Sequence, residues 1–190
     1  YLSANNNVSI VTIKSCKPQY QLHKNVRLLS LEEEETVIYE NEKKENNTIN
    51  KINNLIKRSR SMKKVIKKLN PEIILSFLPY TSFITLLSNR KINKKIIVSV
   101  RNDPTIEYSS KDYNILMRKL YPKATGFVFQ TEDAKKYFDG ILNDINYDII
   151  PNPINPDFIC KPYKNERKKT IVNVGRLYHQ KNHKLLIDSF

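Results

Sequence analysis

Short apolar runs rich in β-branched residues alternate with segments of helical periodicity, and this alternation restricts the possible folds more than any other feature of the chain. Runs such as EIILSF and KIIVSV are hydrophobic nearly throughout, which is typical of parallel strands covered by helices on both faces. The pattern predicts an α/β fold with a doubly wound, Rossmann-like parallel sheet. We expect strands at 8–13, 26–31, 72–77, 95–100, 126–130, 147–150 and 170–174, and helices at 48–69, 81–90, 111–121 and 131–138.

The longest expected helix, 48–69, combines an apolar stripe with a basic remainder. Asn70-Pro71 should end it, because proline disfavours helical geometry in the residue before it. Three interpretations fit the basic residues: a solvated face, an interface to anionic lipid, or a nucleic-acid-binding face, which the lack of interleaved aromatic residues disfavours. The stripe consists of Ile52, Leu55, Ile56, Met62, Val65, Ile66 and Leu69, and the basic residues are Lys57, Arg58, Arg60, Lys63, Lys64, Lys67 and Lys68.

A proline-rich segment, PNPINPDFICKPY, begins at Pro151, where the alternation of strand and helix patterns stops. Proline fixes φ and suppresses both helix and strand, so this stretch predicts a semi-rigid connector. We therefore expect a domain at 1–150, a hinge at 151–169 and the start of a second domain at 170–190. The opening residues are typical of the end of a helix running into a strand, so we expect the start of this first domain, its first strand included, to precede Tyr1.

The net charge of +14 indicates an anionic partner: nucleic acid, an anionic membrane surface or phosphorylated substrates. Cys16 and Cys160 are far apart and form no Cys-x-x-Cys pair, which favours neither a disulfide framework nor a zinc site and fits a reducing cytosol. No apolar run approaches the ~18 residues that span a bilayer. The first residues lack the basic region of a signal peptide. We expect a cytoplasmic protein, with peripheral contact to the inner face of the cell membrane as a further interpretation.

The segment TIVNVGRLYHQKNHKLLIDSF at 170–190 has the pattern of a buried strand, a glycine turn, a basic loop and an amphipathic helix. Gly175 would let the backbone turn tightly at the carboxyl end of the strand, the edge where open α/β sheets bind ligands. Arg176 and Lys181 would lie there beside a helix beginning near Asn182, whose free N–H groups favour anions. An arginine fork and a lysine charge suit a diphosphate. Two exposed basic residues in a basic protein are the simpler interpretation.

The pattern strand-GRL-x-x-QKN-x-x-LLI-x-(A/S)-F in this segment resembles the opening of the donor domain in glycosyltransferase family 4, which has the GT-B fold. FVFQTEDAKKYF resembles the last strand and helix of that family's acceptor domain, and DIIPNPINPDF resembles the hinge between the two domains. IIVSVRNDPTIEY resembles an acceptor-side loop found in one branch of the family. The resemblance extends from about residue 8 to the end of the chain.

This resemblance implies a retaining enzyme that moves a sugar from a nucleotide-diphosphate donor to a hydroxyl of a saccharide or lipid-linked acceptor, without a metal or other cofactor. It implies that Arg176 and Lys181 contact the donor diphosphate, and we expect Gly175 and Asn182 to belong to the same binding site. The paired glutamates of the family's donor domain would lie beyond Phe190. We therefore expect this chain alone to be inactive.

The acceptor-side loop often carries a histidine in the family, and Arg101, Asn102 and Asp103 stand there in this chain. Arg101 cannot act as a base, because its pKa exceeds ~12. Asp103 is able to accept a proton or bind a sugar hydroxyl, and Asn102 is able to hydrogen-bond either substrate. The structural alternative is that Asp103 and Pro104 cap a turn or the start of a helix.

His179 and His183 flank Lys181, but no third ligand stands at a metal-like spacing. We interpret both as solvent-facing loop histidines and expect no metal. Asn152, between two prolines of the hinge, either shapes the cleft between the domains or forms a turn. Two alternatives to a glycosyltransferase stay open: a non-catalytic truncated remnant of such an enzyme, and a basic nucleic-acid-binding α/β protein.

Overall fold

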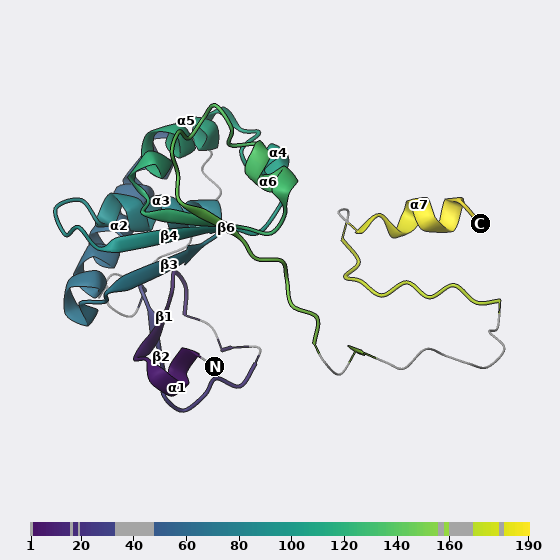
Figure 1. Ribbon diagram of the computed structural model, residues 1–190, viewed down its shortest axis with the longest axis horizontal. Coiled ribbons are helices and arrows are strands. Elements are labelled where there is room, and N and C mark those ends of the chain that lie inside the picture. The colour runs from purple at the N-terminus through teal and green to yellow at the C-terminus, as the bar shows by residue number, and fades with distance from the viewer. Residues whose placement is uncertain are drawn as a thin grey trace. The chain divides into compact units, whose positions relative to one another are not determined.

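The computed structural model describes residues 2–15, 17–18, 20–32, 48–155, 158–159, 169–178 and 181–190. They belong to two units, Tyr1–Asn152 and Pro153–Phe190, both drawn in Figure 1. Cys16, Cys160, His179 and most of the expected hinge lie outside the described residues. The elements are α1 (Leu2–Asn5), β1 (Val8–Thr12), β2 (Val26–Ser30), α2 (Thr48–Leu69), β3 (Ile73–Phe77), α3 (Pro79–Ser88), β4 (Lys95–Val100), α4 (Pro104–Glu107), α5 (Lys111–Leu120), the 3-10 turn η1 (Tyr121–Lys123), β5 (Gly126–Phe129), α6 (Glu132–Lys136), β6 (Tyr147–Ile149) and α7 (His183–Asp188).

All strand pairs of the first unit are parallel, which confirms the predicted Rossmann-like α/β fold. β1 pairs with β2, and a four-stranded sheet has the order β3-β4-β5-β6. Six of the seven expected strands form, each with bounds within one residue of the prediction. The short helix α1 leads directly into β1, as the opening residues indicate. The described strands divide into two sheets, whereas the sequence pattern predicts one.

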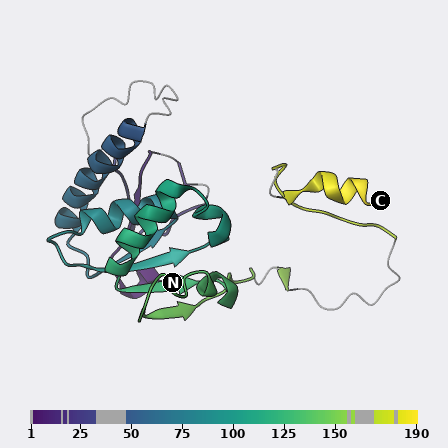
Figure 2. The same ribbon diagram turned by 90° about the horizontal axis from the view of Figure 1, so that it is seen from above.

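The helices α2 to α6 contribute to a single core on one face of the sheets. The buried strand residues Ile96, Val98 and Val100 of β4, with Phe127 and Phe129 of β5, belong to this core. Figure 2 shows α2, α3 and α5 on the same side of the four-stranded sheet. Burial of the opposite face differs between strands: Ser99 of β4 is buried there, whereas the expected burial is wrong for β3.

The opposite face of β3 is exposed to solvent. The exposed fractions of Ile73, Leu75 and Phe77 are 55%, 46% and 46%. These residues alternate with Ile74 and Ser76, which face the core side. An apolar run along a strand predicts burial on both faces only where a second layer of structure covers the sheet.

Helix α2 has the bounds that the sequence predicts, Thr48–Leu69. It ends because Asn70 adopts a left-handed conformation with φ of 45°, and its N–H donates to the Ile66 carbonyl at 2.9 Å. Its predicted stripe is partly wrong, since Ile52 and Ile56 are 52% and 42% exposed. At 100° per residue Ile52 and Ile56 lie roughly 80° and 120° around the helix from the buried Met62, so they border the buried side instead of belonging to it. Among the helices that the structure describes, none is long and apolar enough to cross a bilayer.

A cluster of aromatic side chains packs α4, α5 and α6 onto β5. Tyr108 and Tyr121 are buried, and their hydroxyl oxygens are 2.6 Å apart in a hydrogen bond. Tyr108 also packs edge-on against Phe138, which contacts Phe129 of β5. These contacts fix the chain that follows β4, because Tyr108 closes the short helix α4.

In the second unit, the expected strand at 170–174 does not form. Ile171, Val172 and Val174 are exposed, with Val174 at 90%. A strand needs a hydrogen-bonded neighbour, and the described residues of this unit contain no second strand. The expected helix near Asn182 does form, as α7.

Candidate functional site

Polar side chains meet at the carboxyl edge of the four-stranded sheet. Arg101 directly follows β4, and Gln130 directly follows β5. Asn152 comes shortly after the end of β6. Since β4, β5 and β6 are parallel neighbours, their carboxyl ends lie at one edge. Ligands bind at this edge in open α/β sheets.

Arg101, Gln130 and Asn152 form a closed ring of hydrogen bonds, which we call the edge ring. The Arg101 guanidinium donates to the Asn152 side-chain oxygen. When its amide is oriented to satisfy both ends, Gln130 donates to the Arg101 carbonyl at 2.7 Å and accepts from Asn152 Nδ2 at 2.7 Å. Arg101 is therefore engaged with the protein itself, and it positions the residue at which the first unit ends.

Asn102 and Asp103 lie beside the edge ring and are both exposed. Asn102 Nδ2 donates to Glu107 Oε1 at 2.7 Å. Asp103 Oδ1 accepts from the Thr105 hydroxyl at 2.7 Å and from the Thr105 N–H at 2.9 Å. Asp103 is the N-cap of α4, so the structural alternative for this residue is confirmed.

The capping contacts also affect the acidity of Asp103. The hydrogen bonds from Thr105, first from its hydroxyl and then from its N–H, hold the pKa of Asp103 below its usual range. A carboxylate with a lowered pKa is a weaker base at neutral pH. The same carboxylate is well suited to accept a hydrogen bond from a hydroxyl group.

Sequence reasoning missed Gln130 and Glu107 and assigned Asn152 only to a turn or cleft. A signal for Gln130 is present in FVFQTED, where the first polar residue follows a buried strand. The residues that hydrogen-bond to Gln130 could not be predicted from a local signal. The edge ring joins residues that are far apart along the chain, and it depends on which strands are neighbours in the sheet.

The second unit contains the basic loop with Arg176 and Lys181, and both side chains are exposed. The His183 ring holds this loop: Nε2 lies 3.0 Å from the Arg176 carbonyl, and Nδ1 lies 2.8 Å from Asn173 Nδ2. These partners imply that Nε2 donates and Nδ1 accepts. The Lys181 N–H donates to the Tyr178 carbonyl at 2.9 Å. The Arg176 carbonyl and the Lys181 N–H are therefore both engaged in internal hydrogen bonds.

Two predictions about this loop need correction, those for Gly175 and His183. Gly175 does not adopt a left-handed φ, and a Cβ there would lie 3.5 Å from the His183 ring and from Lys181 Cγ, an ordinary contact distance. The left-handed residue is Asn182, with φ of 46°, and its side chain makes no capping hydrogen bond. His183 is the half-buried first residue of α7, so it is not a solvent-facing loop histidine.

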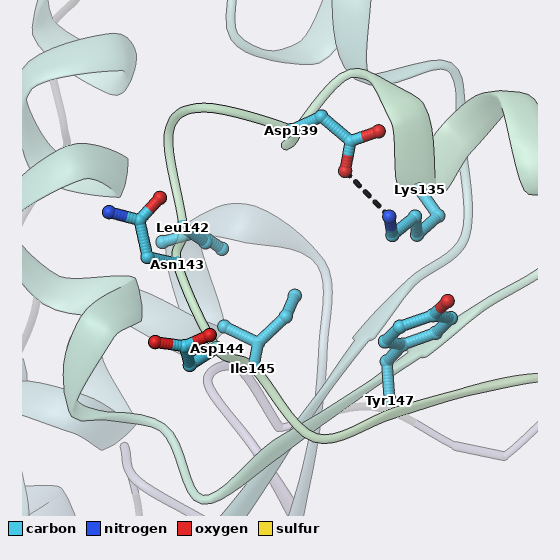
Figure 3. A pocket seen from close by; sticks show the side chains of 7 residues that line it. All are labelled: Lys135, Asp139, Leu142, Asn143, Asp144, Ile145 and Tyr147. Carbon is cyan, nitrogen blue, oxygen red and sulfur yellow. Dashed lines mark hydrogen bonds and ion pairs between the residues drawn. The ribbon is translucent and has the colours of Figure 1, made fainter.

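A pocket of about 510 Å³ lies at the other end of β6 (Figure 3). Lys135 Nζ is 2.6 Å from Asp139 Oδ1 and 5.2 Å from the centroid of the Tyr147 ring. Because β6 begins at Tyr147, this pocket is at the amino ends of the strands, away from the edge ring. Asp139 already neutralises the charge of Lys135 within the pocket. Lys135 is therefore not available as an unpaired cation for an anionic ligand. It is lined by Lys135, Asp139, Leu142, Asn143, Asp144, Ile145 and Tyr147.

Within the described ranges, no three His, Cys, Asp or Glu side chains gather as they would around a metal ion. Comparison with known proteins adds no further assignment: no family model matches the chain, and no curated protein matches its sequence. Two groups of residues are therefore the candidates for function, the edge ring with its neighbours and the basic loop.

Proposed function

We propose that this chain belongs to a glycosyltransferase that moves a sugar from a nucleotide-diphosphate donor to a hydroxyl of a saccharide or lipid-linked acceptor, with retention of configuration. The observation that carries the proposal is the basic loop. It presents Arg176 and Lys181 to solvent on a main chain that His183 and Tyr178 hold in place. Preorganised cations of this kind stabilise charge that develops as a reaction proceeds.

The proposed chemistry requires such cations. The bond between the anomeric carbon and a diphosphate oxygen breaks, and the acceptor hydroxyl oxygen forms the new bond to that carbon while its proton passes to the departing diphosphate oxygen. Negative charge then grows on the departing diphosphate. Arg176 can bind two phosphate oxygens with its planar fork, and Lys181 adds a compact point charge. Together they would stabilise the leaving group without a metal ion.

We assign acceptor binding to the carboxyl edge of the first unit. Asn102 and Asp103 are exposed there and carry amide and carboxylate groups that can bind sugar hydroxyls. Arg101 has a different role in this proposal, since its guanidinium holds Asn152. It acts as a positioning residue at the end of the first unit.

The donor assignment is tested by titrating the 190-residue chain with uridine, guanosine and adenosine diphosphates and their sugar conjugates in a calorimeter. Replacing Arg176 and Lys181 together by alanine should weaken the binding of the preferred diphosphate at least about 100-fold, because each charge-assisted contact contributes about 1.5–3 kcal/mol. The matched control is Arg118→Ala with Lys119→Ala, an exposed pair on α5. Equal affinity in the two double variants would exclude the basic loop as the donor site.

The acceptor assignment is tested by transfer assays on the longest form of the protein that the gene encodes. Asp103→Asn keeps an N-cap acceptor, whereas Asp103→Ala removes it. If the carboxylate binds the acceptor, both variants raise KM for the acceptor, and only the alanine variant also lowers Tm. Normal kinetics in the asparagine variant would leave Asp103 with a capping role alone. Continuation of the reading frame past Phe190 into paired glutamates would separate an active enzyme from a truncated remnant.

A further inference from the structure

One side of α2 presents isoleucine and basic side chains together. Ile52 and Ile56 are exposed, and Arg60, Lys64 and Lys67 are exposed farther along the same side. The spacing of about four residues between these positions places them along one helix face. The buried residues Leu55, Met62, Val65 and Ile66 occupy the opposite side. The exposed side of α2 therefore combines apolar and basic residues, separately from the side that packs on the core.

The turn between α3 and β4 extends this face. Lys63 Nζ donates to the Arg90 carbonyl at 3.0 Å, and Lys94 Nζ donates to Asn70 Oδ1 at 2.6 Å. The Asn89 side chain closes the turn by pairing with both main-chain groups of Lys94, at 2.8 Å and 2.9 Å. Figures 1 and 2 both show the turn beside the C-terminal end of α2.

The turn adds two more exposed cations, Arg90 and Lys91. We call the combined area the α2–turn surface. It consists of Ile52, Ile56, Arg60, Lys64, Lys67, Arg90 and Lys91.

The charge of this region is almost entirely positive. Residues 48–95 contain twelve lysines and arginines and a single acidic residue, Glu72. No carboxylate of the described residues forms an ion pair with Arg60, Lys64 or Lys67. Among the described residues, therefore, no carboxylate neutralises Arg60, Lys64 or Lys67, and these cations would attract an anionic surface.

We propose that the α2–turn surface docks the protein on an anionic lipid bilayer. Ile52 and Ile56 enter the boundary between headgroups and acyl chains, while Arg60, Lys64 and Lys67 contact the lipid phosphates. Interfacial helices combine apolar and basic side chains in this way. Lysines and arginines near an anionic membrane each strengthen binding roughly fivefold. α2 already packs on the core through its other side, so it can dock without rearrangement.

The two isoleucines favour lipid over nucleic acid as the partner. Single-stranded nucleic acids are held by aromatic side chains on which bases stack, and the α2–turn surface contains none. Duplex binding depends chiefly on phosphate contacts, and it uses apolar side chains such as isoleucine only where they wedge between base steps. A bilayer interface removes such side chains from water, which is favourable in proportion to the apolar area buried. This proposal rests on residues that the proposed glycosyltransferase site does not use.

The charge contribution is tested by co-sedimentation of the 190-residue chain with phosphatidylcholine vesicles and with vesicles containing roughly one-third phosphatidylglycerol. We expect binding to the anionic vesicles only, weakening as NaCl rises from about 0.1 M to about 0.5 M. The variant Arg60→Gln, Lys64→Gln, Lys67→Gln should lower the partition coefficient on the order of 100-fold. The matched control, Lys111→Gln, Lys119→Gln, Lys123→Gln, removes the same charge from exposed positions on and after α5 and should lower it far less.

The apolar contribution is tested by Ile52→Ser with Ile56→Ser. This variant should bind anionic vesicles about tenfold more weakly, and the loss should persist at high salt because it does not depend on charge. The control is Ile106→Ser with Ile115→Ser, a pair that is 68% and 42% exposed elsewhere on the same unit. All of these positions are exposed, and circular dichroism should show that every variant keeps the wild-type fold.

Three outcomes would overturn the proposal: equal binding to the two vesicle types, equal losses in a variant and its control, or tighter binding to random-sequence DNA than to anionic vesicles at the same salt. Nucleotide-diphosphate affinity should be unchanged in the α2–turn variants. Vesicle binding should likewise be unchanged in Arg176→Ala with Lys181→Ala. Failure of this proposal is therefore distinguishable from failure of the proposed function.

Discussion

Arg101 and Asn152 are 51 residues apart in the sequence, and the guanidinium of the first donates a hydrogen bond to the side-chain oxygen of the second. Arg101 directly follows β4, and Asn152 lies at the start of the proline-rich connector. Gln130 bridges them through its amide. The edge ring thus fixes the point at which the chain leaves the first unit.

We expect the edge ring to behave as a coupled network. Asn152→Ala should lower the free energy of unfolding by about 0.5–1 kcal/mol, a typical net value for one hydrogen bond. Gln130→Ala should have a similar effect, and urea unfolding of the double variant should reveal a coupling energy of about 0.5 kcal/mol. Strictly additive effects would mean that Gln130 and Asn152 act independently.

The buried pair Tyr108 and Tyr121 should make the protein sensitive to alkaline pH. Burial raises the pKa of both hydroxyls above the usual value of 10.0. The folded state therefore keeps protons that the unfolded chain loses, and stability is fully present below about pH 10 and lost as pH rises further. Each tyrosine should lower the free energy of unfolding by about 1.4 kcal/mol per pH unit above that point.

Denaturant unfolding between pH 8 and pH 11 measures this slope, and the comparison is Tyr108→Phe with Tyr121→Phe. That variant removes both hydroxyls, so neither is left buried without a partner. Its stability should fall less steeply with pH than that of the wild type. Parallel curves would indicate that these hydroxyls do not control the alkaline transition.

The two glycines Gly140 and Gly175 should respond differently to replacement by alanine. Gly140 has a φ of 73°, a conformation that is strained for any residue with a Cβ. Gly140→Ala should therefore destabilise the protein by about 1–2 kcal/mol. Gly175→Ala should leave both Tm and diphosphate affinity nearly unchanged, because its Cβ finds only contacts at 3.5 Å. A large loss of affinity in Gly175→Ala would restore the tight-turn role expected from the sequence.

Local sequence signals predicted local structure well. The run KIIVSV gave the bounds of β4 without error, and the Asn70-Pro71 pair located the end of α2. Asp103 before Pro104 indicated a helix cap, which the structure confirms through Thr105. Each of these features depends on residues within a few positions of one another.

Features that depend on distant residues were not predictable in this way. Ile52 and Ile56 fit an apolar stripe by spacing, and only the packing of α2 shows that they lie outside the core. The segment 170–174 has strand composition but no described neighbour to pair with. His183 holds the basic loop because the chain returns to Asn173 and the Arg176 carbonyl, which its position in the sequence does not reveal.

The uncovered face of β3 also affects how the molecules behave toward one another in solution. Ile73, Leu75 and Phe77 form an exposed apolar patch that favours attraction between molecules. The net charge of +14 opposes this attraction by electrostatic repulsion. Added salt screens the repulsion over a Debye length of about 8–10 Å but leaves the apolar attraction intact. The osmotic second virial coefficient should therefore change from positive to negative as salt rises. We therefore expect added salt to lower the colloidal stability of the protein, so concentrated samples should be kept at low ionic strength.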